Sequence, residues 1–124
     1  LNMRGLVMIY KMKLLENEFN NIKFNGKTLE VRLNDDKRRR IKRGDWIIFY
    51  KLPHLDENIL VNVEQVFIFS SFSEVYTRFP KECFGYKDIG MNDIIKNIYT
   101  IYTEEEEKEK GVMAIKFRLE GDIH

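Results

Sequence analysis

The sequence contains few of the residues that form disulfides and soft-metal sites. Cys83 is the only cysteine, and His54 and His124 are the only histidines. A single cysteine excludes an intrachain disulfide, and this set argues against a transition-metal site with His and Cys ligands. Oxygen-ligated hard cations are the remaining class of metal. We predict no metal and no cofactor.

Long apolar segments are also absent. The longest apolar runs, around Leu6–Tyr10 and Trp46–Tyr50, have the length of a strand, whereas a membrane-spanning helix needs about 20 residues. The first residues, LNMRGLVMIY, lack the long apolar core and the small-residue cleavage site of a signal peptide. We therefore expect a cytoplasmic protein that does not enter a membrane. Leu1–Arg4 could be an extension ahead of the domain.

The length of the chain suits one hydrophobic core. With 124 residues, 44% of them hydrophobic, the chain can bury one core, whereas two domains would each be too small. We therefore expect a single domain over residues 1–124, with a monomer as the default oligomeric state.

Positive charge is concentrated in one segment, although the whole chain has a net charge of only +1. The segment from Lys27 to Arg43 holds eight basic and three acidic residues and so carries a net charge of +5. Its basic residues are Lys27, Arg32, Lys37, Arg38, Arg39, Arg40, Lys42 and Arg43. Such a polarised distribution indicates a positive site.

Apolar alternation and short aromatic or β-branched runs predict five strands. In the second, Leu29, Val31 and Leu33 form an apolar face, and Glu30 and Arg32 lie on the opposite, polar face. The predicted strands are Gly5–Lys13, Thr28–Leu33, Trp46–Lys51, Ile59–Ser70 and Val112–Leu119, with a polar tail at Glu120–His124.

Short helices are predicted between the strands. Helical spacing places Phe19 and Ile22 on one face of the first helix, with Asn17 facing away. Ser71 and Thr103, each followed by a glutamate three residues later, predict N-terminal caps.

Two further features concern the second half of the chain. Asn92 is predicted to cap a helix that continues to Tyr102, and Gly111 to end the last helix. Lys81–Gly90 is predicted to be irregular, in the manner of a mobile flap.

Five strands among short helices predict an α+β fold: a small antiparallel or mixed β-barrel of about five strands with short helices in its connections. No Gly-rich phosphate loop is present, which argues against a doubly wound nucleotide-binding sheet.

Several segments, in one order along nearly the whole chain, resemble the ASCH domain family of PUA-like barrels. They are Lys13-Leu14, Gly26-Lys27-Thr28-x-Glu30-x-Arg32-Leu33-x-Asp35, Lys37-Arg38-Arg39, Ile41-Lys42-x-Gly44-Asp45-x-Ile47-x-Phe49, Tyr102-x-x-Glu105-x-Glu107 and Gly111-Val112-x-Ala114-Ile115.

This resemblance implies a cleft between barrel and helices that holds RNA or a nucleotide-like ligand. Lys27, Glu30 and Arg32 keep the spacing of the motif that lines the cleft in the family. Gly26 lies one residue closer to Lys27 than in the usual pattern. Because Lys27 has the opposite strand parity to Glu30, it reaches the cleft only if the turn rotates it inward.

The resemblance also leaves catalysis open. One bacterial branch of the family hydrolyses N4-acetylcytidine with a lysine, a threonine and a glutamate, and another member resembles a divalent-metal ribonuclease. Lys27 matches that lysine. The segment that corresponds to the glutamate, Lys87-Asp88-Ile89-Gly90, contains no glutamate, so only the lysine is carried over. An amidohydrolase would therefore use Lys27 with Thr28 or Glu30, and a ribonuclease or a protein-docking module is a weaker alternative.

The residue types fit nucleic-acid binding. On a strand, Glu30 and Arg32 share a face about 7 Å apart, so a carboxylate and a guanidinium could reach one ligand. The loop Lys37–Arg43 would hold phosphates; alternatively, it is a solvated loop balanced by the acidic helix Glu104–Glu109. Tyr99 and Tyr102 are the candidates for base stacking.

Overall fold

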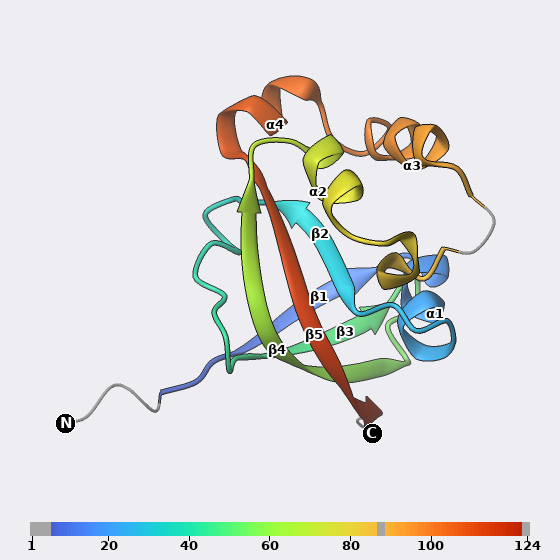
Figure 1. Cartoon of the computed structure of the whole chain (residues 1–124). Coiled ribbons are helices and arrows are strands. Elements are labelled where there is room, and N and C mark those ends of the chain that lie inside the picture. Colours follow the sequence, from blue (N-terminus) through green and yellow to red (C-terminus); the bar gives the residue numbers. More distant parts are fainter. Residues whose placement is uncertain (1–5, 87–88, 123–124) are drawn as a thin grey trace.

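The structure is a computed structural model that describes residues 6–86 and 89–122 (Figure 1). The predicted extension Leu1–Arg4, the pair Lys87-Asp88 and His124 lie outside these residues. In chain order the elements are β1 (Ile9–Leu14), α1 (Glu16–Phe24), β2 (Leu29–Leu33), β3 (Trp46–Lys51), β4 (Asn58–Phe69), α2 (Phe72–Arg78), the 3-10 helix η1 (Lys81–Phe84), α3 (Met91–Ile98), α4 (Glu104–Lys110) and β5 (Val112–Asp122).

The five strands form one mixed, curled sheet in the order β1-β3-β4-β5-β2. β1 pairs with β3 in parallel, and the other neighbours are antiparallel. Within the described residues β1 and β2 do not pair with each other, so the sheet is a half-barrel with an opening between these two edges. The predicted α+β fold, with five strands and helices in the connections, is confirmed.

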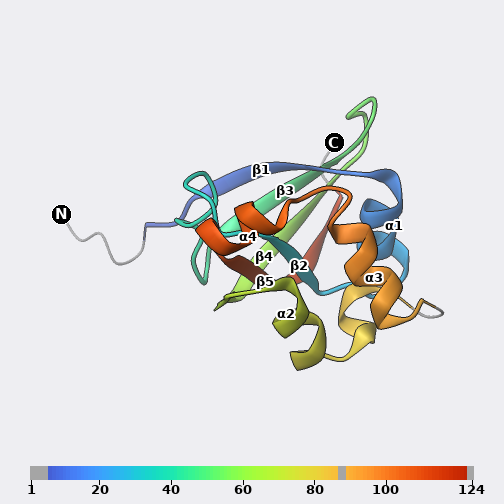
Figure 2. The same cartoon turned by 90° about the horizontal axis from the view of Figure 1, so that it is seen from above.

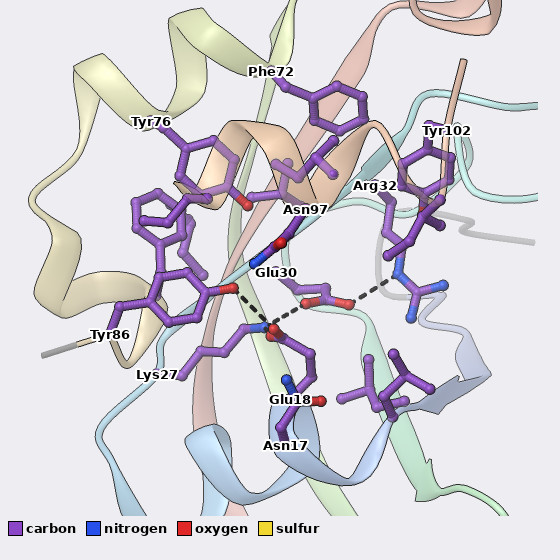
Figure 3. Close-up of a pocket in the computed structure, with 18 of the residues that line it drawn as sticks. Asn17, Glu18, Lys27, Glu30, Arg32, Phe72, Tyr76, Tyr86, Asn97 and Tyr102 are labelled. Carbon is purple, nitrogen blue, oxygen red and sulfur yellow. Dashed lines mark hydrogen bonds and ion pairs between the residues drawn. The ribbon is translucent and has the colours of Figure 1, made fainter. Parts of the chain in front are cut away.

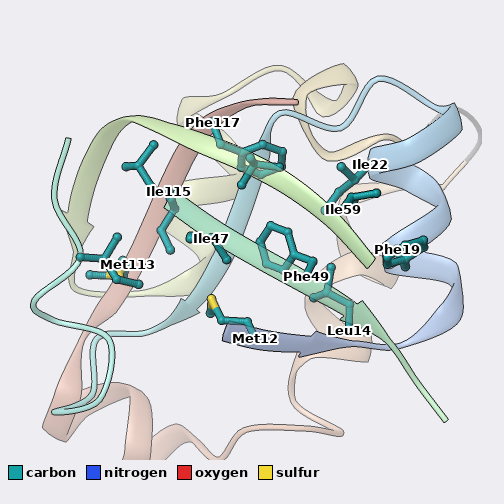
Figure 4. Packing of buried hydrophobic residues seen from close by; sticks show 13 residues of the cluster. Met12, Leu14, Phe19, Ile22, Ile47, Phe49, Ile59, Met113, Ile115 and Phe117 are labelled. Atoms are coloured by element: carbon teal, nitrogen blue, oxygen red, sulfur yellow. The ribbon is translucent and has the colours of Figure 1, made fainter. Parts of the chain in front are cut away.

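One hydrophobic cluster fills the concave side of the half-barrel and the space beneath α1 (Figure 4). Phe19 of α1, Phe49 of β3 and Phe117 of β5 are each at most 1% exposed, and the rings of Phe49 and Phe117 lie 5.8 Å apart. Burial of a side chain of this size contributes about 1.5–3 kcal/mol. This cluster therefore fixes α1 against the end of the sheet.

A second cluster lies between the other face of β2 and β5 and the helices α2, η1 and α3. Val112 and Ala114 of β5 belong to it, whereas the alternate residues Met113 and Ile115 belong to the first cluster. β5 is therefore buried on both faces there, as its unbroken apolar sequence requires. Phe84 of η1 is 2% exposed in this cluster. The predicted irregular segment thus contains a packed helical turn.

The helix caps agree with the sequence except in one helix. Ser71 and Thr103 accept hydrogen bonds from the backbone N–H groups three residues on, and Gly111 ends α4, as predicted. The prediction for Asn92 is wrong, because α3 begins at Met91 with Gly90 at its N-cap and ends before Tyr99. No side chain caps this helix, and the Gly90 carbonyl accepts its first backbone hydrogen bonds, as the N-cap carbonyl of any helix does.

The last strand is longer than predicted. β5 continues to Asp122 because Gly121 and Asp122 pair with Leu60 and Ile59 of β4, so most of the predicted polar tail is strand. Over residues 6–86 and 89–122, we find no helix with the length and apolar character that crossing a membrane requires.

Candidate functional site

A pocket of about 620 Å³ lies at the opening between β1 and β2. α1 and α3 both lie at this end of the molecule (Figure 1, Figure 2). Residues from the end of β1, from α1, β2, α2, η1 and α3, and from the turn after α3 line it. The half-barrel therefore provides one wall and the helical layer provides the others.

Five polar side chains form a continuous hydrogen-bonded row in this pocket (Figure 3). The Tyr86 hydroxyl donates to Glu18 Oε1 at 2.9 Å, and Glu18 Oε2 accepts from the ammonium of Lys27. The Lys27 ammonium lies 2.8 Å from Glu30 Oε1, and Arg32 Nε donates to Glu30 Oε2 at 2.9 Å. Two cations thus alternate with two anions.

Lys27 reaches the row because it precedes β2, so the alternation of side chains along the strand does not fix its direction. Gly26 adopts a positive φ of 72°, and the Lys27 N–H then donates to Asn21 O at 3.0 Å. Gly85, also with positive φ, packs so closely here that a Cβ on it would lie 2.8 Å from Asn21 Cβ and 3.2 Å from Lys27 Cβ. The turn therefore rotates Lys27 inward, as the motif requires.

Glu30 and Arg32 enter the pocket from β2 on the same face. Their partners on β5 are Ile115 and Met113, which point toward the first core cluster. Arg32 also donates from Nη2 to the carbonyl of Lys13 on β1 at 2.9 Å, so its side chain spans the opening of the half-barrel. Glu30 and Arg32 share one face of β2, as the strand spacing predicts, and Glu30 is only 4% exposed.

Glu30 and Lys27 remain ionised near neutral pH. Burial by itself raises the pKa of Glu30, but the nearby charges of Lys27 and Arg32 outweigh it and the pKa lies below its usual value. Burial likewise lowers the pKa of Lys27, and the charges of Glu30 and Glu18 reverse the effect, so this pKa lies above its usual value. Lys27 therefore keeps its proton.

Aromatic and aliphatic side chains form the remaining walls. Tyr102 stacks on Phe72, with ring centroids 5.4 Å apart and an interplanar angle of 16°. The rings of Tyr76 and Phe84, which also line the pocket, lie 4.4 Å apart. Tyr102, one of the two stacking candidates, therefore lines the pocket.

The other stacking candidate, Tyr99, lies outside the pocket lining. Its hydroxyl donates to Glu107 Oε1 at 2.8 Å, and Glu107 Oε2 accepts from the backbone N–H of Phe72 at 2.7 Å. Burial and the hydrogen bond to Glu107 raise the pKa of Tyr99 to about 12. Tyr99 therefore joins the end of α3 to α4, and Glu107 joins α4 to α2.

Thr28 does not take part in the row. Its side chain is exposed and lies outside the pocket lining, and its backbone N–H donates to the carbonyl of Cys83 at 2.9 Å. The three residues assigned to the hydrolytic alternative are thus not brought together, since only Lys27 and Glu30 of them meet.

Three of the six cations in the basic loop between β2 and β3 pair with the loop's own aspartates. Arg38 pairs with Asp35 at 2.7 Å and Arg39 with Asp36 at 2.9 Å. Lys42 pairs with Asp45, at 2.9 Å. Across the described residues no ion pair joins this loop to α4.

The remaining loop cations differ in position. Lys37 and Arg38 line a second, smaller pocket beside the first. Arg40 and Arg43 line neither pocket and are involved in no ion pair within the described part of the chain. The predicted basic residues therefore do not form one surface.

Glu18, Asn17 and Tyr86 line the pocket but were not among the predicted site residues. Asn17 was expected to face away from the core, and no spacing in the sequence relates Tyr86 to the motif at Lys27. The only available signal was the placement of the first helix directly before that motif. Among the described residues no group of three or more His, Cys, Asp or Glu side chains is arranged to hold a metal ion.

Comparison with known proteins places this geometry in a family. A family model described as the ASCH domain matches residues 12–120. The crystal structure of the hypothetical protein PH0355 is 35% identical, with a TM-score of 0.77, and the match covers 90% of this chain and 99% of that one. The solution NMR structure of PF0455 from Pyrococcus furiosus is 32% identical, with a TM-score of 0.67, covering 91% and 98%.

A more distant structure shares the fold alone. The crystal structure of ASCH from Zymomonas mobilis is 15% identical, with a TM-score of 0.56, and the match covers 87% of this chain and 65% of that one. The comparison with curated proteins gives no match. Since the family model spans most of the sequence and two solved structures are more than 30% identical over nearly their whole length, the chain belongs to the ASCH domain family, with its PUA-like fold.

Proposed function

We propose that this protein binds RNA or a nucleotide-like ligand, with one base in the pocket between β1 and β2. The observation that carries the proposal is the charged row of Glu18, Lys27, Glu30 and Arg32, with Lys27 and Glu30 buried, in a pocket with aromatic walls. A volume of about 620 Å³ lies in the range of small-molecule sites. A few fixed polar groups among apolar walls are also typical of such sites.

The row matches the edge of a base in its hydrogen-bonding groups. The carboxylate of Glu30 can accept from an exocyclic amino group, and Arg32 can donate to a carbonyl or ring nitrogen. Bases in single-stranded RNA expose these edges and stack on aromatic rings. Tyr102, already stacked on Phe72, is the aromatic side chain placed for this role.

Two features favour binding over hydrolysis. Lys27 keeps its proton, because its pKa is raised, so it cannot serve as a general base. Thr28 is exposed and outside the pocket. The charged row is therefore better suited to hold a ligand than to deprotonate a nucleophile.

Fluorescence anisotropy with a labelled single-stranded RNA tests the proposal. We expect saturable binding, and if about four phosphates are contacted, log affinity falls against log salt with a slope near −3. Arg32→Gln should weaken binding at least tenfold, whereas Arg118→Gln, which removes the same charge outside the pocket, should not. Absence of binding at low salt, or equal effects of both variants, would contradict the proposal.

An amidohydrolase acting on N4-acetylcytidine, or on a similar modified nucleoside, is the second candidate. It is favoured by the position of protonated Lys27 between two carboxylates, where the ammonium could polarise an acetyl carbonyl while Glu18 activates water. Chromatography after incubation with N4-acetylcytidine would detect cytidine. Hydrolysis would be established if the wild type releases cytidine and Glu18→Gln, with an unchanged circular dichroism spectrum, does not. If the wild type releases no cytidine, binding alone is favoured.

A further inference from the structure

A second pocket of about 430 Å³ adjoins the first and is lined mainly by cations. We call it the basic pocket, and its charged residues are Lys11, Lys13, Arg32, Lys37 and Arg38. Lys13 and Arg32 line both pockets. A ligand that occupies the first pocket can therefore extend into the basic pocket past these two side chains.

All three lysines of the basic pocket lack a counter-ion among the described residues. Lys11 and Lys13 are exposed at alternate positions of β1, and Lys37 begins the basic part of the loop after β2. None of the three forms an ion pair within the described part of the chain, in contrast to Lys42, which pairs with Asp45. The basic pocket therefore has unneutralised positive charge that an anion would stabilise.

The two arginines are held in place before any ligand binds. Arg32 is fixed at Nε by Glu30 and at Nη2 by the carbonyl of Lys13. Arg38 is fixed by Asp35 through Nη1 and through its backbone N–H. Its Nε is buried and has no hydrogen-bond partner. Guanidinium groups that are already fixed in this way lose little entropy when they bind a phosphate.

From these observations we infer that the basic pocket is a phosphate subsite, and that the ligand is a nucleotide or an RNA segment rather than a free nucleoside. This inference rests on the proposed binding of a base in the first pocket. The guanidinium of Arg32 separates the two positions, so base and phosphate bind on either side of one side chain. The subsite uses Lys11 of β1, which lies outside the basic segment, and does not use Arg39, Arg40, Lys42 or Arg43.

Isothermal titration calorimetry at low salt tests the inference with the four ribonucleosides and their 5′- and 3′-monophosphates. For the base that binds, at least one monophosphate should bind about tenfold more tightly than the nucleoside, and salt should reduce this advantage. Lys11→Gln combined with Lys37→Gln should reduce the advantage and leave nucleoside binding unchanged, because these lysines line only the basic pocket. Lys108→Gln combined with Lys116→Gln removes two exposed lysines outside both pockets and should have no effect.

The outcomes separate the two proposals. Equal affinities for nucleoside and monophosphates, or an advantage that Lys11→Gln with Lys37→Gln leaves unchanged, would overturn the phosphate subsite and leave base binding intact. If neither nucleosides nor monophosphates bind, both proposals fail. An advantage of the 5′- or of the 3′-monophosphate alone would support the subsite and give the direction of the bound strand.

Discussion

The ammonium nitrogen of Lys27 lies 2.8 Å from Glu30 Oε1, and the two side chains are only 5% and 6% exposed. Removing one member of a buried pair leaves the other charge without compensation, at a cost of about 3–5 kcal/mol. We expect Lys27→Met to lower the free energy of unfolding by about this amount at pH 7, because Glu18 and Glu30 would then repel each other. Urea denaturation followed by circular dichroism measures it.

A double variant provides the control for this prediction. Adding Glu30→Gln to Lys27→Met removes one of the unpaired carboxylates, so the double variant should be more stable than the sum of the single effects predicts. Lys116→Met, at an exposed position, should change stability by at most about 0.5 kcal/mol. Strict additivity would mean that Lys27 and Glu30 do not interact.

The acid limb of the stability curve should depend on Glu30. Its pKa is lower in the folded protein than the value of about 4.3 expected for an unfolded chain. Its stabilising contribution is therefore complete above that value and is lost as the pH falls through the folded pKa. Glu30→Gln should then lower the free energy of unfolding most near pH 7. The difference in free energy of unfolding between this variant and the wild type should shrink below about pH 5. A difference that stays constant from pH 7 to pH 3 would contradict this assignment.

Gly85 should be less tolerant of alanine than Gly26. Both have positive φ, so each substitution costs about 1–2 kcal/mol of backbone strain. At Gly85 the added Cβ also meets Asn21 at 2.8 Å and Lys27 at 3.2 Å, whereas at Gly26 nothing lies within 4 Å. We expect Gly85→Ala to lower the thermal midpoint by several degrees more than Gly26→Ala. Equal shifts would mean that close packing at Gly85 has no energetic consequence.

Tyr102 and Tyr99 should differ in their effect on RNA binding. Stacking of one base on an aromatic side chain is worth about 1–3 kcal/mol, so Tyr102→Leu should weaken binding by about fivefold or more. Tyr99→Phe removes the hydrogen bond to Glu107 outside the pocket and should affect stability but not affinity. Anisotropy titrations of both variants with RNA measure the two affinities. A loss of affinity confined to Tyr99→Phe would refute the assignment of Tyr102 as the stacking residue.

Local sequence patterns were sufficient for most of the fold. The alternation around Leu29 and the aromatic run from Trp46 each mark a strand, because such side chains suit a half-buried pleated surface. The capping residues Ser71 and Thr103 mark two helix starts. The prediction failed at Asn92, because the helix begins one residue earlier with Gly90 at its N-cap and no side-chain cap, so no capping residue marks the start.

The site was only partly accessible from sequence. Glu30 and Arg32 could be placed on one face because side chains two residues apart on a strand point the same way. The contact between Glu18 and Tyr86 could not be predicted, since their hydrogen bond joins positions 68 residues apart and depends on how η1 packs against β2. Charge density was a poor guide to the rest, because Arg39 and Lys42 are paired within their own loop and Lys11 lies outside the basic segment.

A titration of the isotopically labelled protein with single-stranded RNA, followed by two-dimensional NMR of backbone amides, tests the central claim most directly. We predict that the largest chemical-shift changes fall on residues lining the pocket, among them Lys27, Arg32, Tyr86 and Tyr102, with small changes at Arg118. Changes centred on Arg118 and the exposed face of β5, or no changes at low salt, would contradict base binding between β1 and β2.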